Sequence, residues 1–334
     1  MNPPAILSCG EVLWDLFPDG PRFGGAPANF ACHAARLGAQ VSLLSAVGDD
    51  TRGHEAIAIL QGFGIAPSLI RVIADAPTGA VGVTVDAAGK PSFEIRAGAA
   101  WDQIAWTPEL ASRLDTVDAV YFGTLGQRSA MSRSSIQQAL QVAAARGIPR
   151  VLDVNLRRPF FDAALVRESI GRATVLKLSD DELSDVAAAC GLPHVDNPID
   201  LLRSLLKREK LDLAVMTRGA AGALLVSITE VVDQPGIPTV VCDTVGAGDA
   251  FTAALVVGLL RGNSLTAIAR RACEVAAAVC AQRGAVPARP KPSPACDGPL
   301  NRKPHIPVPT FNRPIRPASS YRTNFCKTKN SCIS

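Results

Sequence analysis

A glycine-rich segment over Asp243–Phe251, D-T-V-G-A-G-D-A-F, carries the residues best suited to chemistry in this sequence. Gly246, Ala247 and Gly248 remove side-chain bulk at the start of a helix that we expect over 249–260. The first N–H groups of a helix lack acceptors and the helix dipole adds positive potential, so this turn is a candidate anion site. Asp249 would repel a bound phosphate unless it faces the hydroxyl group that receives a phosphoryl group, in which case it is the base. Asp249 could also be an ordinary helix N-cap.

A second segment, F-G-G-A-P-A-N over Phe23–Asn29, is suited to binding hydroxyl groups. Its paired glycines allow the backbone to approach a ligand closely, and the Asn29 amide can both donate and accept. Upstream, the first expected strand is followed by G-E-V-L-W-D over Gly10–Asp15, which ends in an acidic residue. Ligands of parallel α/β sheets bind beyond the carboxyl ends of strands, so Asp15 and Asn29 are candidates for holding a sugar. A plain turn at Gly24-Gly25 and a helix cap at Asn29 remain open alternatives.

Two common nucleotide-binding motifs are missing from the sequence. There is no G-x-x-x-x-G-K-[ST], which disfavours a P-loop protein. No G-x-G-x-x-G follows the first expected strand, which disfavours an NAD-dependent oxidoreductase with a Rossmann start. Any phosphate binding therefore has to come from the C-terminal glycine-rich turn.

Composition predicts a globular protein with a large core, because 48% of the 334 residues are hydrophobic and 19% are charged. The apolar runs are too short to span a membrane, and no basic leader precedes an apolar stretch. The nine cysteines include no C-x-x-C and the four histidines lack metal-ligand spacing, so neither a disulfide scaffold nor a zinc site is expected. We expect a cytoplasmic protein. Six cysteines lie in apolar stretches and are expected to be buried free thiols: Cys9, Cys32, Cys190, Cys242, Cys273 and Cys280.

The C-terminal segment differs from the rest of the chain. Residues 287–334 hold nine Lys and Arg, one acid and ten of the 25 prolines, whereas residues 1–286 hold 25 basic and 29 acidic residues. Such a Pro-rich, charge-biased segment is typical of disorder, although its basic charge could contact an anionic partner. A mildly acidic folded part argues against nucleic-acid binding. We therefore expect one domain over 1–288 and a disordered tail over 289–334.

Short apolar runs alternating with helical patterns predict a parallel sheet covered on both faces. The expected strands are Ala5–Ser8, Val41–Ala46, Ala119–Phe122, Val151–Val154, Val175–Leu178 and Leu213–Thr217. The expected helices are Asn29–Leu37, Gly53–Gln61, Ser134–Ala145, Asp181–Ala189, Leu201–Lys207, Asp249–Leu260 and Ser264–Cys280. A β-hairpin over Ala80–Ile95 does not fit this alternation. With Trp14–Phe23 it is expected to form a small projecting sheet.

Taken together, Gly24–Asn29 and Asp243–Phe251 resemble the two signatures of the ribokinase-like, or pfkB, carbohydrate kinase family. The run Val47–Asp50 followed by Gly53 is also similar to that family. Gly10–Pro18, with the continuation Ala28–Ala31, is most similar to bacterial fructokinases. The resemblance covers roughly residues 5–288.

The resemblance implies a three-layer α/β/α fold with a mainly parallel central sheet and a small β-sheet lid from about 12–23 and 80–100. It implies ATP-dependent phosphorylation of a sugar hydroxyl, most similar to conversion of fructose to fructose 6-phosphate, with Mg²⁺ arriving largely with ATP. A kinase for 2-keto-3-deoxygluconate, ribose or a nucleoside stays open, as does a sugar- or nucleotide-binding protein without catalysis. A homodimer formed through the lid is also implied as a possibility.

Residue by residue, the resemblance implies Asp249 as catalytic base and Gly246, Ala247 and Gly248 as the anion hole. The residues implied to hold the sugar are Asp15, Gly25 and Asn29, with Arg157 of the D-x-N-x-R run and Arg96 after the hairpin as further candidates. Thr217-Arg218-Gly219 resembles a turn beside the nucleotide phosphates, and Asp243 and Thr244 resemble the start of a loop that also binds a monovalent cation such as K⁺. A plain strand-end turn at Thr217 and a surface salt bridge at Arg157 are the alternatives.

One position departs from the family pattern. The family often has Asn-x-x-Glu near the magnesium and phosphates, whereas this chain has Ser179-Asp180-Asp181-Glu182. Ser179 can still donate a hydrogen bond, and Glu182 is expected to organise water around Mg²⁺.

Overall fold

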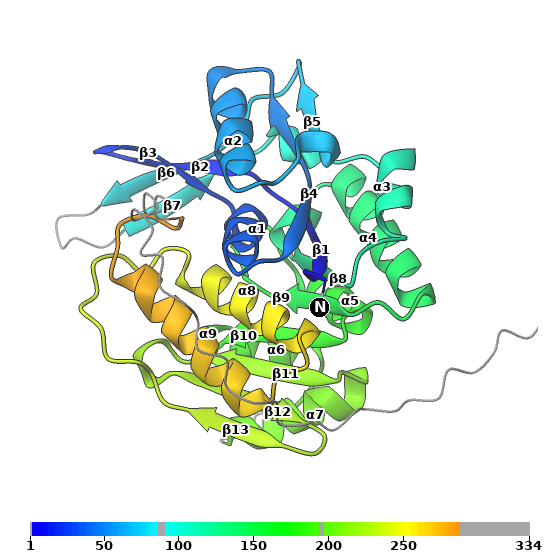
Figure 1. Ribbon diagram of the computed structural model, residues 1–334, viewed down its shortest axis with the longest axis vertical. Helices are drawn as coiled ribbons and strands as arrows, with labels where there is room; N and C mark the ends of the chain where they lie inside the picture. The colour runs from blue at the N-terminus through cyan, green and yellow to red at the C-terminus, as the bar shows by residue number, and fades with distance from the viewer. Residues whose placement is uncertain (1, 86–90, 194–196, 287–334) are drawn as a thin grey trace, which may run out of the picture. The chain divides into compact units, whose positions relative to one another are not determined.

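A nine-stranded sheet forms the centre of the fold in the computed structural model, which describes residues 2–85, 91–193 and 197–286 (Figure 1). The strand order is β13-β12-β11-β10-β9-β8-β1-β4-β5. All neighbours pair parallel from β11 to β5, and β12 and β13 are antiparallel. The strands are β1 (Ala5–Cys9), β4 (Gln40–Gly48), β5 (Ile70–Ile73), β8 (Ala119–Gly123), β9 (Arg150–Asp153), β10 (Val175–Ser179), β11 (Leu213–Thr217), β12 (Ala223–Ser227) and β13 (Val231–Gln234).

Helices cover both faces of this sheet, because successive strand residues point to opposite sides. Ile6 and Val151 belong to the core on the side of α1, α2, α8 and α9, whereas Leu7 and Leu152 belong to the core on the side of α3 to α7. The helices are α1 (Ala26–Arg36), α2 (Thr51–Gly62), α3 (Pro108–Arg113), α4 (Ala130–Ala145), α5 (Ala163–Arg172), α6 (Leu183–Ala189), α7 (Pro198–Glu209), α8 (Ala247–Leu260) and α9 (Leu265–Cys280). The expected α/β/α fold is confirmed.

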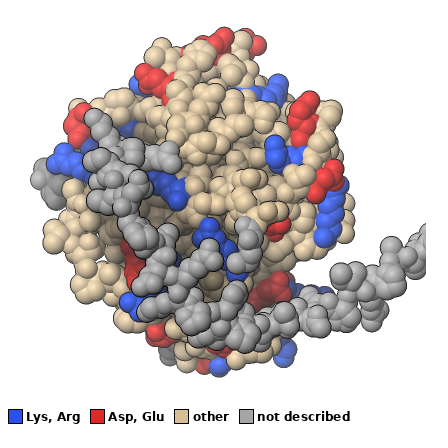
Figure 2. All heavy atoms as spheres, in the orientation of Figure 1, with Lys and Arg blue, Asp and Glu red and all other residues tan. Residues whose placement is uncertain are grey.

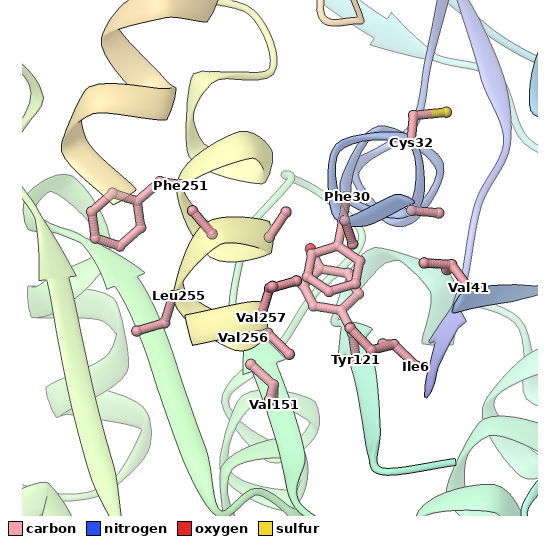
Figure 3. Close-up of a cluster of buried hydrophobic side chains, with 14 of the residues drawn as sticks. Ile6, Phe30, Cys32, Val41, Tyr121, Val151, Phe251, Leu255, Val256 and Val257 are labelled. Carbon is pink, nitrogen blue, oxygen red and sulfur yellow. The ribbon is translucent and has the colours of Figure 1, made fainter. Parts of the chain in front are cut away.

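The core on the first side holds α1 and α8 next to one another over the sheet (Figure 3). Phe30 of α1 stacks on Tyr121 of β8, with ring centroids 3.8 Å apart and planes 6° apart. Phe251 and Leu255 of α8 pack in the same cluster. This packing fixes the first turns of both helices relative to the carboxyl ends of the strands.

A second sheet of four strands projects from the main layer, in the order β3-β2-β6-β7 (Figure 1). Its strands are β2 (Leu13–Phe17), β3 (Gly20–Gly24), β6 (Gly79–Val85) and β7 (Pro91–Ile95). β2 and β6 pair parallel in the middle, and β3 and β7 are antiparallel edges. The predicted small sheet is therefore present, while residues 86–90 of its hairpin lie outside the described residues.

Several boundaries differ from those expected, and two of the differences matter for the site. Helix α1 begins at Ala26 and α8 at Ala247, after Gly25 and Gly246, which take φ of 102° and 80° at the N-cap positions. A side chain at Gly25 would lie 2.5 Å from the Glu11 carbonyl oxygen, so only glycine fits there. Asn29 and Asp249 consequently lie inside their helices. Their interpretation as helix caps is wrong.

The remaining sequence expectations have mixed outcomes. Cys9, Cys32, Cys190 and Cys273 are buried and free as expected. Cys242 is exposed because it lies in the loop that precedes α8, and Cys280, at the end of α9 beside that loop, is partly exposed. No helix among the described residues is long and apolar enough to cross a membrane. On the face shown in Figure 2, Lys and Arg side chains lie in small groups among Asp and Glu. The expected tail over 289–334 lies outside the described residues.

Candidate active site

The two glycine-rich segments meet in one hydrogen bond. Asn29 Nδ2, in the first turn of α1, donates to Asp249 Oδ2, in the first turn of α8, over 2.8 Å. Asn29 is buried and Asp249 is half-buried. Among the described residues no donor is bonded to the other carboxylate oxygen, Asp249 Oδ1. This oxygen could therefore accept a hydrogen bond from the hydroxyl group of a ligand.

Burial raises the pKa of Asp249 to about 6, and the nearby Asp153 carboxylate adds to the rise. The hydrogen bond from Asn29 and the charges of Lys177 and Arg157 act in the opposite direction. A carboxyl group with a pKa just below neutrality is matched to accepting a proton from an alcohol near pH 7. This environment therefore suits Asp249 to accept a proton near neutral pH.

The backbone of the glycine turn before Asp249 leaves no room for a side chain at Gly246. Gly246 has a left-handed φ, and a Cβ there would lie 2.6 Å from Ala285 Cα. The Ala247 N–H bonds to the Thr244 carbonyl at 3.3 Å, whereas the N–H groups of Gly248 and Asp249 have no acceptor within the described residues. Of the three residues expected to form an anion hole, only Ala247 has its N–H already bonded within the described residues. The N–H groups of Gly246, Gly248 and Asp249 are free to bind an anion.

Asp243 anchors the loop that leads into this turn. Its Oδ1 accepts the Val245 N–H at 3.0 Å, and its Oδ2 accepts the Gly284 N–H at 2.9 Å. Arg22 Nη1 of β3 lies 3.5 Å from the same Oδ2. The carboxylate therefore ties the loop to the segment after α9 and to the small sheet. Thr244 is exposed, and its carbonyl accepts from Ala247.

Asp15 and Arg22 lie opposite one another where the small sheet borders the site. The Asp15 carboxylate folds over Gly24, with Oδ2 only 2.7 Å from the position that a Cβ on Gly24 would take. Burial raises the pKa of Asp15 to about 6; the charges of Arg157 and Arg22 oppose the rise and Asp243 adds to it. Asp15 therefore shares an electrostatic environment with the loop before α8.

Glu11 is a buried carboxyl group to which the sequence reasoning gave no role. It is 2% exposed, and its Oε1 accepts the N–H of Ala26, the first residue of α1, at 3.2 Å. Burial raises the pKa of Glu11 to about 7, and the charge of Asp249 adds to the rise. Glu11 thus caps α1 from a different element and holds Asn29 in place indirectly. Its position directly after the first strand was the available signal.

Arg157 follows a turn in which Asn155 has a left-handed φ of 44°. The Leu156 N–H of that turn donates to Glu182 Oε1 over 2.6 Å. Arg157 is exposed, and its charge opposes the burial-driven rise in the pKa of Glu11, Asp15 and Asp249. The Arg157 guanidinium therefore acts on the same group of carboxylates.

Ser179 and Glu182 form a closed hydrogen-bonded unit. Glu182 Oε2 accepts from the Ser179 N–H at 2.8 Å and from the Ser179 hydroxyl at 3.0 Å. The Ser179 hydroxyl is thus directed to Glu182. No group of three or more His, Cys, Asp or Glu among the described residues could hold a metal ion. A Mg²⁺ ion that brings its own phosphate and water ligands fits this single carboxylate, whereas an all-protein cage does not.

The other predicted residues are less closely joined to Asp249. Thr217 ends β11 directly beside Ser179 of β10. The Arg218 guanidinium pairs with Asp233 of β13, which directs it to the edge of the sheet. Gly219 has a φ of 52° in the turn that follows. Arg96 is exposed, and among the described residues no hydrogen bond joins its guanidinium to the site.

The chain is similar to known proteins in both sequence and structure. Residues 20–292 match the pfkB family carbohydrate kinase. The chain is 29% identical over 319 residues to probable fructokinase-5 of Arabidopsis thaliana, covering 88% of this chain and 97% of that protein. It is 28% identical over 264 residues to aminoimidazole riboside kinase of Salmonella typhimurium, covering 76% and 80%.

A solved structure of an uncharacterized sugar kinase from Pyrococcus horikoshii in complex with ATP superposes with a TM-score of 0.70 at 30% identity. The match covers 84% of this chain and 94% of that one. The family match spans most of the chain and includes both glycine-rich segments. The chain belongs to the pfkB family of carbohydrate kinases.

Proposed function

We propose that this protein transfers the γ-phosphoryl group of ATP to a sugar hydroxyl, with fructose as substrate and fructose 6-phosphate as product. The observation that carries the proposal is the 2.8 Å hydrogen bond from Asn29 to Asp249. It brings together a residue suited to hold a sugar and a carboxylate suited to activate it. The fructokinase name of the Arabidopsis relative supports fructose as the first sugar to test.

Asp249 is the proposed base. Asn29 holds Oδ2, which leaves Oδ1 to accept the hydroxyl proton as the sugar oxygen bonds to the γ-phosphorus. The bond from that phosphorus to the bridging oxygen breaks, and ADP leaves with the electron pair. The N–H groups of Gly248 and Asp249, at the positive end of α8, stabilise the charge that grows on the γ-phosphate oxygens. Gly246 and Ala247 shape the turn that presents these groups.

The sugar is proposed to bind between α1 and the small sheet, against Asp15, Gly25 and Asn29. The carboxylate and amide can each hold two neighbouring hydroxyl groups. Arg157, whose charge acts on both Asp15 and Asp249, is proposed to reach the sugar or the phosphate. Arg96 is a candidate only if the small sheet closes as a lid over the sugar, which would exclude water from the transferred group.

The nucleotide is proposed to lie along the ends of β10 and β11, beside Ser179 and the Thr217-Arg218-Gly219 turn. Glu182 is the residue that would hold Mg²⁺, through water, and the ion would neutralise phosphate charge. Asp243 and Thr244 are proposed as the edge of a K⁺ site. Because the Asp243 carboxylate already bonds to Val245 and Gly284, Thr244 would contribute mainly through its exposed oxygen atoms.

Another sugar or nucleoside is the main alternative, and the name of the Salmonella relative makes aminoimidazole riboside a specific candidate. A sugar- or nucleotide-binding protein without catalysis is the second alternative. The environment that raises the Asp249 pKa towards neutrality favours a catalyst, since a binding role needs no such tuning. A cytoplasmic location and a homodimer formed through the small sheet complete the proposal.

The test is ADP release by the purified protein with ATP and Mg²⁺ against fructose, ribose, 2-keto-3-deoxygluconate and aminoimidazole riboside. We expect the highest kcat/KM with fructose, and ³¹P NMR of the product should give a phosphomonoester at C6. Higher kcat/KM with another acceptor would replace fructose in the proposal. No acceptor-dependent ADP release would overturn the kinase assignment for this chain.

A further inference from the structure

A buried ion pair lies beneath the first turn of α8. Lys177 of β10 and Asp153 of β9 are direct partners in the parallel ladder, and both side chains point to the α8 side of the sheet. Lys177 Nζ is 3.0 Å from Asp153 Oδ1, and the two side chains are 8% and 1% exposed. Neither the glycine-rich motifs nor the family resemblance drew attention to Lys177.

The pair has a definite orientation along α8. Its negative end bonds to the second turn of the helix, because Asp153 Oδ2 accepts from the Thr252 hydroxyl at 2.9 Å. Its positive end lies under the first turn, since a Cβ on Gly248 would be 3.3 Å from Lys177 Nζ. Gly248 and Thr252 are one helical turn apart, so the ammonium is the end nearer the free N–H groups.

Stability alone does not account for this arrangement. The N-terminus of a helix already carries positive potential, so an ammonium there is unfavourable for the helix. A buried ion pair is seldom more stabilising than apolar side chains of similar volume. Burial acts to lower the pKa of Lys177, but the carboxylates of Asp153 and Glu182 outweigh it and raise the pKa. The ammonium therefore stays charged.

We propose that Lys177 is a positioning residue for phosphate: its ammonium, aimed by Asp153, reinforces the N–H groups of Gly248 and Asp249 that bind the γ-phosphate. This inference deepens the proposed function and rests on it for the identity of the anion. Lys177 also stabilises the ionised form of Asp249, since its charge acts against the burial that raises the Asp249 pKa. Two sources of positive potential then converge on one turn, the helix dipole and the ammonium.

The experiment compares Lys177→Met with the double variant Lys177→Met/Asp153→Asn. The single variant leaves a buried, unpaired carboxylate and should lose stability. The double variant removes both charges and should recover most of the Tm. We expect kcat of the double variant to stay on the order of 100-fold below wild type, as for loss of a preorganised donor. The acidic limb of its kcat profile should move to lower pH, because loss of the Asp153 charge lowers the pKa of Asp249 by more than loss of the Lys177 charge raises it. Lys207→Met, at an exposed position of α7, is the matched control.

Turnover that returns to the wild-type value together with the Tm would overturn the inference, because the pair would then be structural only. Calorimetric titration with a non-hydrolysable ATP analogue gives a readout independent of turnover. The double variant should bind the analogue at least tenfold more weakly and adenosine equally well. Equal analogue affinity would also overturn the inference. A wild-type protein that phosphorylates nothing would instead refute the proposed function, and analogue binding would then decide the role of Lys177.

Discussion

The imidazole of His33, in α1, lies with Nε2 2.8 Å from the carbonyl oxygen of Ala285. Burial lowers the pKa of His33 to about 4, so the ring is neutral near pH 7 and its Nε2–H donates to this carbonyl. Ala285 in turn packs against Gly246, where a side chain would collide with it. Besides the Asn29–Asp249 hydrogen bond, helix α1 and the turn before α8 are therefore also connected through Ala285. His33 had no assigned role in the sequence reasoning.

This contact makes Gly246→Ala a sharp test of the glycine turn. The new methyl group would lie within 2.7 Å of Ala285 atoms, and the left-handed φ adds strain of about 1–2 kcal/mol. We expect kcat to fall on the order of 100-fold, as for loss of anion-hole donors, together with a lower Tm. Gly262→Ala is the matched control, because Gly262 has a φ of 70° but nothing within 4 Å of the added methyl. A kcat for Gly246→Ala as high as that of Gly262→Ala would contradict a role for the glycine turn in catalysis.

The raised pKa of Glu11 predicts how the stability of the folded protein depends on pH. Its folded-state pKa of about 7 lies above the ordinary 4.5, so its ionised form is destabilising in the folded protein. The contribution of Glu11 to the free energy of unfolding is most favourable below pH 4.5, and it is lost as the pH rises from about 4.5 to 7. Glu11→Gln should therefore stabilise the protein at pH 8 by up to about 3 kcal/mol, and not at pH 4. Urea unfolding at both pH values measures this, with the exposed Glu55→Gln as control. A destabilised variant at pH 8 would contradict the prediction.

Asn29→Leu removes the donor to Asp249 while keeping a similar volume. A hydrogen bond to a charged group contributes about 1.5–3 kcal/mol, so we expect kcat/KM to fall roughly 10- to 100-fold. The pKa of Asp249 should rise further without this bond, which moves the acidic limb of the kcat profile to higher pH. A pH–rate series of both proteins checks this. An unchanged acidic limb would show that the hydrogen bond from Asn29 does not affect the pKa of Asp249.

The architecture could be predicted from the sequence because it depends on apolar patterning. Val151 and Leu152 on opposite faces of β9 illustrate a buried strand that reads as a continuous apolar run. The first residues of α1 and α8 could not be predicted, because they depend on Gly25 and Gly246 adopting a positive φ at the N-cap positions. Glu11 and Lys177 act through distant elements, α1 and α8, which local spacing does not reveal. Both motifs that meet at Asp249 were identifiable because each is dense in small residues.

The tail gives a prediction about domain organisation. We propose that residues 1–288 form the whole kinase domain, since the core formed by the described residues and every candidate site residue lie within them. Truncation after Ala288 should leave both kcat and Tm unchanged. Steady-state assays and thermal melting of the truncated and full-length chains measure this. A large drop in either would place part of 289–334 in the fold.

The most direct test of the account is the turnover of Asp249→Asn with the acceptor that the wild-type protein phosphorylates best. The amide keeps the shape of the carboxylate but cannot take the hydroxyl proton. Loss of a general base predicts a kcat lower by about 100- to 10,000-fold. The KM for the acceptor should remain within a few-fold of wild type, because the sugar contacts proposed for Asp15 and Asn29 are kept. Near-normal kcat would contradict the central claim that Asp249 is the base.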